Sequence, residues 1–155
     1  MKLGTLCYIE KENSYLMLHR TKKENDMHKN LWVGLGGKLN AGESPEDCVI
    51  REVFEESGLK IQNPTLRGIL TFPSFSNHED WYVFLFVAKD FTGEIGDCAE
   101  GELAWIEKDK INDLPMHEGD KYFFQWIDEL KGVFSAKFIY EDNIFKEYEL
   151  IAHES

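Results

Sequence analysis

Cysteine and positive charge are both scarce in this sequence. The three cysteines, Cys7, Cys48 and Cys98, are widely separated and odd in number, and no two of them form a CxxC pair. This usage argues against a disulfide framework and against a structural zinc site, and it is typical of the reducing cytoplasm. We therefore expect a cytoplasmic protein.

Long apolar segments are also missing. The longest apolar run, residues 81–88, is far shorter than the roughly 20 residues that a membrane-spanning helix needs. The segment 1–10 has neither the apolar core nor the small-residue cleavage site of a signal peptide. We expect no membrane partner.

Acidic residues dominate the charge. The chain contains 29 Asp and Glu against 17 Lys and Arg, which gives a formal net charge of -12. Such a chain is a poor ligand for a nucleic-acid polymer, because binding to the phosphate backbone depends on Lys and Arg that displace counterions. If the protein binds a phosphate-rich small molecule, a bound cation has to supply the positive charge.

One domain over residues 1–155 is the simplest organisation. Hydrophobic residues make up 43% of the chain and aromatic residues 14%, which is enough for a buried core. The sequence has no internal repeat and no linker rich in Pro, Gly or Ser. It leaves open whether the protein is a monomer or a homodimer.

The apolar pattern predicts strands, two helices and a terminal hairpin. Strands are predicted at 3–9, 14–20, 66–75, 81–88 and 103–106, and a short strand at 31–38 runs into a glycine-rich turn. Helices are predicted at 44–57 and 120–130, a loop at 21–30, and the hairpin at 135–140 and 144–151. This mixture indicates an α/β or α+β sandwich.

The segment 44–57 carries the strongest helix signals. Ser44 is an N-cap candidate, and Pro45 is suited to the first helical position. Two acidic residues follow in the first turn, and Gly58 lies where a left-handed C-cap is expected. We therefore expect a well-defined helix here.

Three glutamates of this helix can converge. Glu52 and Glu56 are four residues apart on one face, and Glu55 is their neighbour. Like charges at this spacing destabilise a helix by roughly a few tenths of a kcal/mol per pair, so the cluster needs a cause. A hard divalent cation such as Mg²⁺ is one cause, and Arg51 would orient a carboxylate by a bidentate pair. A solvated helix face is the plain alternative.

A longer pattern surrounds these glutamates. Residues 37–59 match Gx5Ex7REUxEExGU, with U an aliphatic residue, at every defined position: Gly37, Glu43, Arg51, Glu52, Val53, Glu55, Glu56, Gly58 and Leu59. The segment resembles the Nudix box. The resemblance implies a Nudix fold, in which helices sandwich a mixed β-sheet and the box forms a loop–helix–loop. It also implies hydrolysis, dependent on Mg²⁺ or Mn²⁺, of a nucleoside diphosphate linked to a further group.

The flanking sequence is similar in order and spacing to MutT-like 8-oxo-purine nucleoside triphosphatases. The resemblance implies metal ligation by the Gly36 carbonyl and by the carboxylates of Glu52, Glu55, Glu56 and Glu100. It implies a general base at Glu52 or Glu56, with Glu100 as a further option, and Arg51 as the residue that holds a carboxylate in place. The substrate-binding residues that we expect are Lys23, Trp32, Gly37, Lys38, Phe72 and Asp120.

Three positions depart from the vertebrate-type enzymes of this group. Gly119 replaces the first acid of the pair that reads the oxidised base, and Asp120 retains the second. His117 replaces a pocket tryptophan, and Val33 replaces a pocket asparagine. The catalytic assignment does not depend on these positions, but the mode of base recognition does.

The resemblance implies hydrolysis of oxidised purine nucleoside triphosphates, such as 8-oxo-dGTP, to the monophosphate and pyrophosphate. A second hypothesis keeps the family and changes the substrate to ADP-ribose, a dinucleoside polyphosphate or an unmodified dNTP. A third is a nucleotide-sensing domain without catalysis. It is disfavoured because all the box glutamates are present.

Overall fold

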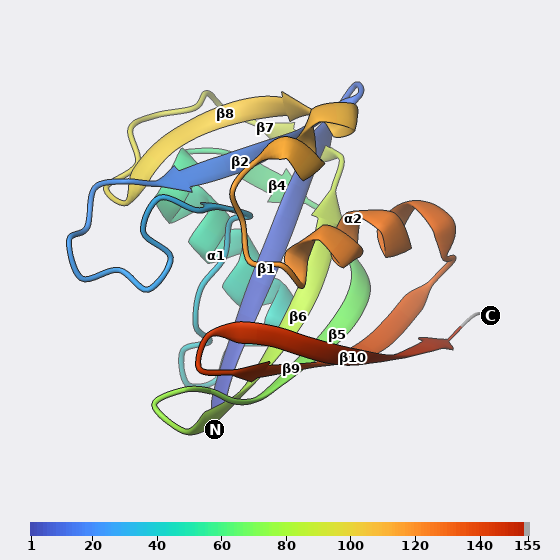
Figure 1. Ribbon diagram of the computed structural model, residues 1–155. Coiled ribbons are helices and arrows are strands. Elements are labelled where there is room, and N and C mark those ends of the chain that lie inside the picture. The colour runs from blue at the N-terminus through green and yellow to red at the C-terminus, as the bar shows by residue number, and fades with distance from the viewer. Residues whose placement is uncertain (154–155) are drawn as a thin grey trace.

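The computed structural model describes residues 1–153, which form a mixed β-sheet flanked by helices (Figure 1). The strands are β1 (Lys2–Lys11), β2 (Ser14–Arg20), β3 (Trp32–Val33), β4 (Lys60–Gln62), β5 (Thr65–Ser76), β6 (Glu79–Ala88), β7 (Asp90–Thr92), β8 (Gly101–Glu107), β9 (Val133–Glu141) and β10 (Ile144–His153). The helices are α1 (Pro45–Ser57), α2 (Asp120–Glu129) and the 3-10 helix η1 (Lys108–Asp113).

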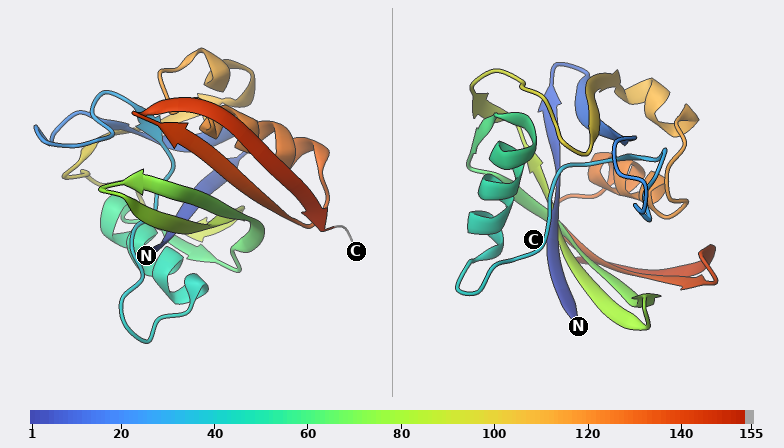
Figure 2. Two further views of the ribbon diagram at one scale, coloured as in Figure 1. Left: turned by 60° about the horizontal axis from the view of Figure 1, so that its bottom comes forward. Right: turned by 90° about the vertical axis from the view of Figure 1, so that its left-hand side faces the viewer.

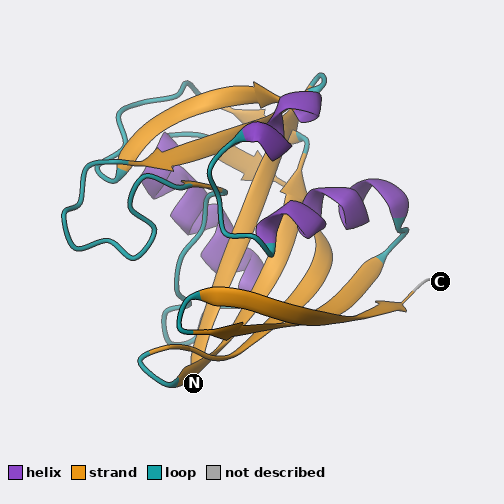
Figure 3. Cartoon of the chain, viewed as in Figure 1, coloured by secondary structure: helices purple, strands orange, loops and turns teal. Residues whose placement is uncertain are grey.

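The main sheet has the order β10-β9-β5-β6-β1-β2-β3, and β8 also pairs with β2. The pairs β1–β6 and β5–β9 are parallel, and the other pairs of this sheet are antiparallel. The apolar run 81–88 lies in β6 between β1 and β5, so its predicted central place in the sheet is confirmed. A separate two-stranded sheet joins β4 to β7 (Figure 3).

Helices α1 and α2 cover opposite faces of the sheet (Figure 2). Alternate residues of β1 serve the two sides, since Tyr8 packs with Phe123 of α2 whereas Cys7 packs with Val53 of α1. This is the period-two alternation expected of a strand buried on both faces. The expected mixed sheet between helices is confirmed.

Helix α1 begins and ends where its sequence predicts. The Ser44 hydroxyl accepts a hydrogen bond from the Asp47 N–H at 3.0 Å, and the Asp47 carboxylate accepts one from the Ser44 N–H at 3.1 Å. The chain leaves the helix at Gly58, whose φ of 82° is left-handed. The capping box and the glycine together set the register in which α1 presents its glutamates.

The structure differs from the predicted elements at several short segments. Of the strand expected at 31–38, only β3 is regular, because residues 34–38 turn and run alongside β1 through single bridges at Leu35 and Lys38. Strands β4 and β7 and helix η1 were not predicted, since three to six residues carry little periodicity. No helix within residues 1–153 is both long and apolar enough to cross a membrane.

Replacing Ser44 by Ala is expected to lower the free energy of unfolding by about 1 kcal/mol, because the N-cap acceptor is lost. Asp47→Ala removes the reciprocal bond, so the double variant should lose less than the sum of the two single losses. Urea unfolding of the four proteins measures this cycle. Strict additivity would show that the two bonds act independently.

Candidate active site

A cavity of about 490 Å³ opens between the sheet, α1 and the loop that joins β2 to β3. One end is polar and acidic, and its wall contains Gly36, Gly37, Lys38, Glu52, Glu56 and Glu100. The other end is largely apolar, and its wall contains Val33, Phe72, Phe75, His117, Asp120, Phe123 and Tyr140. The cavity therefore joins two chemically different environments.

The glycine turn forms the floor of the acidic end. The Thr5 N–H of β1 donates to the Gly37 carbonyl at 2.8 Å, which fixes the turn against the sheet. The Gly36 N–H donates to Glu56 Oε1 at 2.8 Å. A Cβ on Gly37 would overlap the carboxylate of Glu52, so only glycine allows this close approach.

Arg51 joins the glutamates of the helix to the preceding loop. Its guanidinium donates to both carboxylate oxygens of Glu43, at 2.7 and 2.8 Å, and to Glu52 Oε1 at 2.8 Å. It also reaches Glu55 at 3.2 Å and the Lys38 carbonyl at 3.1 Å. The bonds from Arg51 to Glu43, together with a hydrogen bond from the Asn40 N–H, lower the pKa of the Glu43 carboxyl to about 2. Arg51 therefore holds Glu52 in a fixed orientation.

Glu56 is the most buried acid of the cluster, with 8% of its surface exposed. Burial raises the pKa of Glu56 well above its ordinary value, the Gly36 N–H opposes this, and the charges of Glu100 and Glu52 add to it. Glu100 Oε2 is itself buried, 2.9 Å from Arg20 Nη1 but without a hydrogen bond of acceptable geometry. The carboxylates of Glu52, Glu56 and Glu100 are thus held close together where little water reaches them. A bound cation would lower the repulsion between them.

These residues fit a divalent cation that takes few protein ligands. Within residues 1–153, no group of three or more His, Cys, Asp or Glu side chains is placed so that it could hold a metal ion by itself. Arg51 and Arg20 engage two of the acids instead. Mg²⁺ commonly keeps several waters and binds through one or two carboxylates plus substrate phosphates, so a complete protein shell is not required.

At the apolar end, aromatic rings surround one partly buried acid. Phe72 stacks on Phe138 with centroids 5.4 Å apart and packs against Phe75 at 5.2 Å. Burial raises the pKa of Asp120, the first residue of α2, to about 7. The Tyr140 hydroxyl accepts a hydrogen bond from the Gly119 N–H at 2.8 Å and so fixes the start of that helix.

The predicted site residues divide into two groups in the structure. The cavity wall brings together Gly36, Gly37, Lys38, Glu52, Glu56, Phe72, Glu100 and Asp120. The wall does not include Lys23, Trp32, Arg51 or Glu55.

The second group lies close by. The Glu55 side chain is 57% exposed and pairs with Arg51, and Lys23 Nζ lies 3.5 Å from Glu100. Trp32 stacks on His19 with centroids 4.6 Å apart. Metal ligation by Glu55 and substrate contacts by Lys23 and Trp32 stay predictions.

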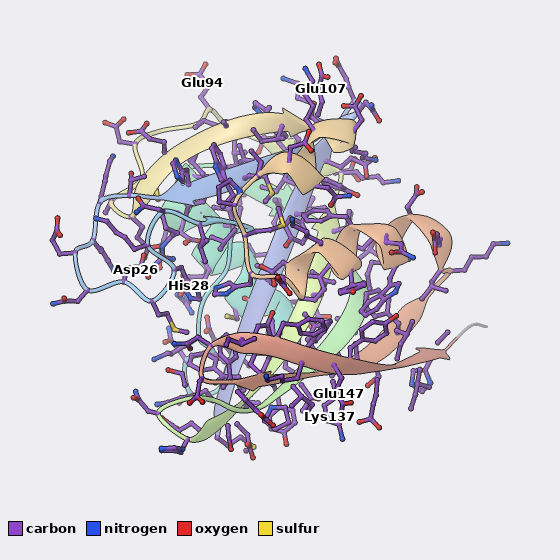
Figure 4. All side chains as sticks on the ribbon, viewed as in Figure 1. Asp26, His28, Glu94, Glu107, Lys137 and Glu147 are labelled. Carbon is purple, nitrogen blue, oxygen red and sulfur yellow. The ribbon has the colours of Figure 1, made fainter. Side chains whose placement is uncertain are left out.

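Sequence reasoning missed several residues of the wall, namely Arg20, Met27, His28, Phe75, Trp81 and Tyr140. Met27 and His28 belong to the stretch predicted only as a loop, and Figure 4 shows His28 on that loop. Trp81 and Phe75 flank the turn between β5 and β6, where they fit the pattern of ordinary strand residues. Nothing in their spacing signalled a shared cavity, because long-range pairing brings them together.

Comparison with known proteins places this geometry in context. The model of the NUDIX domain family matches residues 2–127. The chain is 33% identical over 153 residues to the Nudix hydrolase YvcI of Bacillus subtilis, an alignment that covers 96% of this chain and 90% of that one. It is 31% identical over 111 residues to the oxidized purine nucleoside triphosphate hydrolase of Mus musculus, covering 72% and 70%.

A solved structure extends the likeness to the whole fold. The crystal structure of a MutT protein from Bacillus halodurans superimposes with a TM-score of 0.85 at 31% identity, and the match covers 97% of each chain.

The raised pKa of Asp120 predicts a pH-dependent stability. Its pKa is about 7 in the folded protein against an ordinary 3.8, so its contribution to stability is complete below about pH 4 and is lost as the pH rises to about 7. Asp120→Asn cannot ionise. As the pH rises from about 4 to about 7, the parent should therefore lose stability relative to the variant. The difference between their free energies of unfolding should change by at most about 4 kcal/mol and stay constant above this range. Urea unfolding at pH 4 to 8 tests this, and parallel curves would contradict the assigned burial.

Proposed function

Because the chain belongs to the Nudix hydrolase family, we propose that it hydrolyses nucleoside triphosphates to the monophosphate and pyrophosphate, with oxidised purines such as 8-oxo-dGTP preferred. The observation that carries the proposal is the single cavity that joins an acidic glycine turn to an aromatic end bearing Asp120. A triphosphate suits the first end and a flat heterocycle the second. The name of the mouse relative supports the same substrate class.

The Gly36 carbonyl and one or two of the carboxylates of Glu52, Glu56 and Glu100 would hold Mg²⁺ or Mn²⁺, with substrate phosphates and water as the other ligands. Such an ion neutralises phosphate charge, activates the attacking water and favours the ionised form of nearby carboxylates. Nudix enzymes as a family use divalent metal ions, and the net charge of -12 makes a cation the natural partner for phosphates here.

Within this arrangement Glu56 is the proposed general base. Its carboxylate lines the cavity, and one oxygen is fixed by the Gly36 N–H at 2.8 Å. When it is ionised, this carboxylate can accept a proton from a water molecule held beside it in the cavity. Arg51 is the positioning residue that keeps Glu52 beside the Gly37 turn.

Lys38 is the proposed phosphate contact at the exit of the glycine turn. It lines the cavity, and its Nζ lies 5.5 Å from the centroid of the Trp81 ring. That contact leaves the ammonium near the acidic end without an ion pair to any acid among residues 1–153. The Lys38 ammonium can then meet the terminal phosphates.

At the other end, Phe72 offers a ring face to a base and Asp120 offers a carboxyl group to its edge. With a pKa of about 7, Asp120 is present in both protonation states near neutral pH. A protonated carboxyl donates a hydrogen bond and an ionised one accepts, so this acid is suited to reading the donor and acceptor pattern of an oxidised purine.

Glu56→Gln is expected to lower kcat by at least a hundredfold, because it removes a metal-binding charge and the proposed base. The neutral amide can still accept the Gly36 N–H and relieves the repulsion from Glu100, so the free energy of unfolding should not fall. Initial rates and urea unfolding of the same preparation measure both quantities. Glu46→Gln, in the exposed first turn of the same helix, is the matched control. Full activity of Glu56→Gln would refute the assigned site.

A hydrolysis panel tests the substrate. With Mg²⁺, we expect kcat/KM for 8-oxo-dGTP to exceed that for dGTP by at least about tenfold, or roughly 1.4 kcal/mol. Asp120→Ala should lower kcat/KM for 8-oxo-dGTP more than that for dGTP and so reduce this ratio, and EDTA should abolish all turnover. Comparable rates on plain dNTPs, or a lead for ADP-ribose or a diadenosine polyphosphate, would retain the hydrolase and overturn the oxidised-purine assignment. No turnover of any compound would favour a sensor.

A further inference from the structure

A chain of polar contacts ties the loop between β2 and β3 to the start of α2. Arg20, which lies beside Glu100, donates from Nε to Asp26 Oδ2 at 2.7 Å. The other oxygen of Asp26 accepts the His28 N–H at 3.0 Å. His28 Nδ1 then lies 2.7 Å from Nε2 of His117. Figure 4 shows Asp26 and His28 together on this loop.

Both histidines belong to the wall of the cavity. His117 also contacts Phe75 edge-on, with centroids 6.0 Å apart, and its carbonyl accepts the N–H of Asp120 at 3.0 Å. The imidazole pair is therefore adjacent to the acid and the aromatic ring of the apolar end. The His28–His117 pair therefore belongs to the apolar end of the cavity and is more than a surface contact of the loop.

The bond between the two rings makes their proton positions interdependent. Burial and the charge of Arg20 lower the pKa of His28, and burial with His28 lowers the pKa of His117 to about 4, so both rings are neutral near pH 7. One nitrogen of each neutral ring carries a proton. If His28 donates, His117 must carry its own proton on Nδ1. If His117 donates, its Nδ1 is an acceptor. The Nδ1 atom of His117 makes no hydrogen bond within residues 1–153.

We propose that His28 is a positioning residue that fixes the ring orientation and the tautomer of His117, and that His117 is thereby a specificity-determining residue for the heterocycle of the substrate. The ligand class is a planar base with a polar edge, read by a neutral imidazole next to Asp120. This inference rests on the proposed function, because it assigns the apolar end of the same cavity to the base.

The same hydrogen bonds explain why the His28 ring, and not the loop as a whole, orients His117. Asp26 and Arg20 already anchor the loop backbone through their own bonds. Removing the His28 ring leaves both of those contacts in place, so it isolates the link to His117. A purely structural role would then leave substrate affinity unchanged.

The test compares His28→Leu, which removes the bond, with His28→Asn, whose amide places a polar atom near the position of Nδ1. His153→Leu is the control, since that side chain is exposed at the end of β10 and does not belong to the cavity wall. We expect His28→Leu to raise KM for the preferred purine triphosphate about tenfold with kcat within twofold, the size of effect expected from one hydrogen bond. His28→Asn should recover most of the loss, and His153→Leu should match the parent.

Two readouts are independent of turnover. The dissociation constant of the nucleoside monophosphate, measured by calorimetry in EDTA, should rise by a similar factor in His28→Leu. NMR of the parent protein with ¹⁵N-labelled histidine should show two neutral rings, with the signal of His117 moved in both His28 variants. The NMR result on the parent stands even if His28→Leu fails to fold.

The outcomes separate this inference from the proposed function. Normal KM and normal monophosphate affinity in His28→Leu would overturn it while leaving the hydrolase intact, as would a loss confined to kcat, or equal losses in the Leu and Asn variants. Absence of hydrolysis in the parent, with monophosphate affinity that still depends on His28, would overturn the proposed function alone.

Discussion

The concentration of negative charge at one partly buried point is the constraint on which the rest of the site depends. Glu52, Glu56 and Glu100 line the same end of the cavity, and Glu56 has 8% of its surface exposed. Such a cluster opposes folding unless positive charge meets it. Arg51 pairs with Glu52 and Arg20 with Glu100 on the protein side of the cluster. Under the proposed function, a cation and a phosphate chain would occupy its cavity side.

The sheet makes that arrangement rigid. Strand β1 is buried on both faces, and its Thr5 and Cys7 amides bond the glycine turn while its other side supports α2. Helix α1 is fixed independently by its capping box and by Val53 in the core. The carboxylates of Glu52 and Glu56 are thus presented by a helix, and the backbone groups by a turn docked on a strand, so neither part depends on a flexible loop for its position.

The apolar end is built in another way. Its wall gathers side chains from β5, β6, β9, the segment before α2 and the loop after β2, which are distant in the chain. The hydrogen bond from the Gly119 N–H to the Tyr140 hydroxyl and the bond between His28 and His117 hold these pieces together. Under the proposed function, the acidic end would supply the chemistry and the apolar end would decide which base is accepted. Substitutions such as His117 and Gly119 can therefore alter the substrate without disturbing the glutamates.

The sequence by itself determined the helix, its caps and the spacing of Glu52 and Glu56, because these depend on residues within one or two turns of each other. It also determined most strands and the family, through the pattern over residues 37–59. The resemblance already implied that Glu100 joins the acidic end. Only the tertiary structure decided that Glu55 and Trp32 lie outside the wall and that His28 meets His117. Those contacts join residues up to 89 positions apart, and they follow from strand pairing and loop packing that no local pattern records.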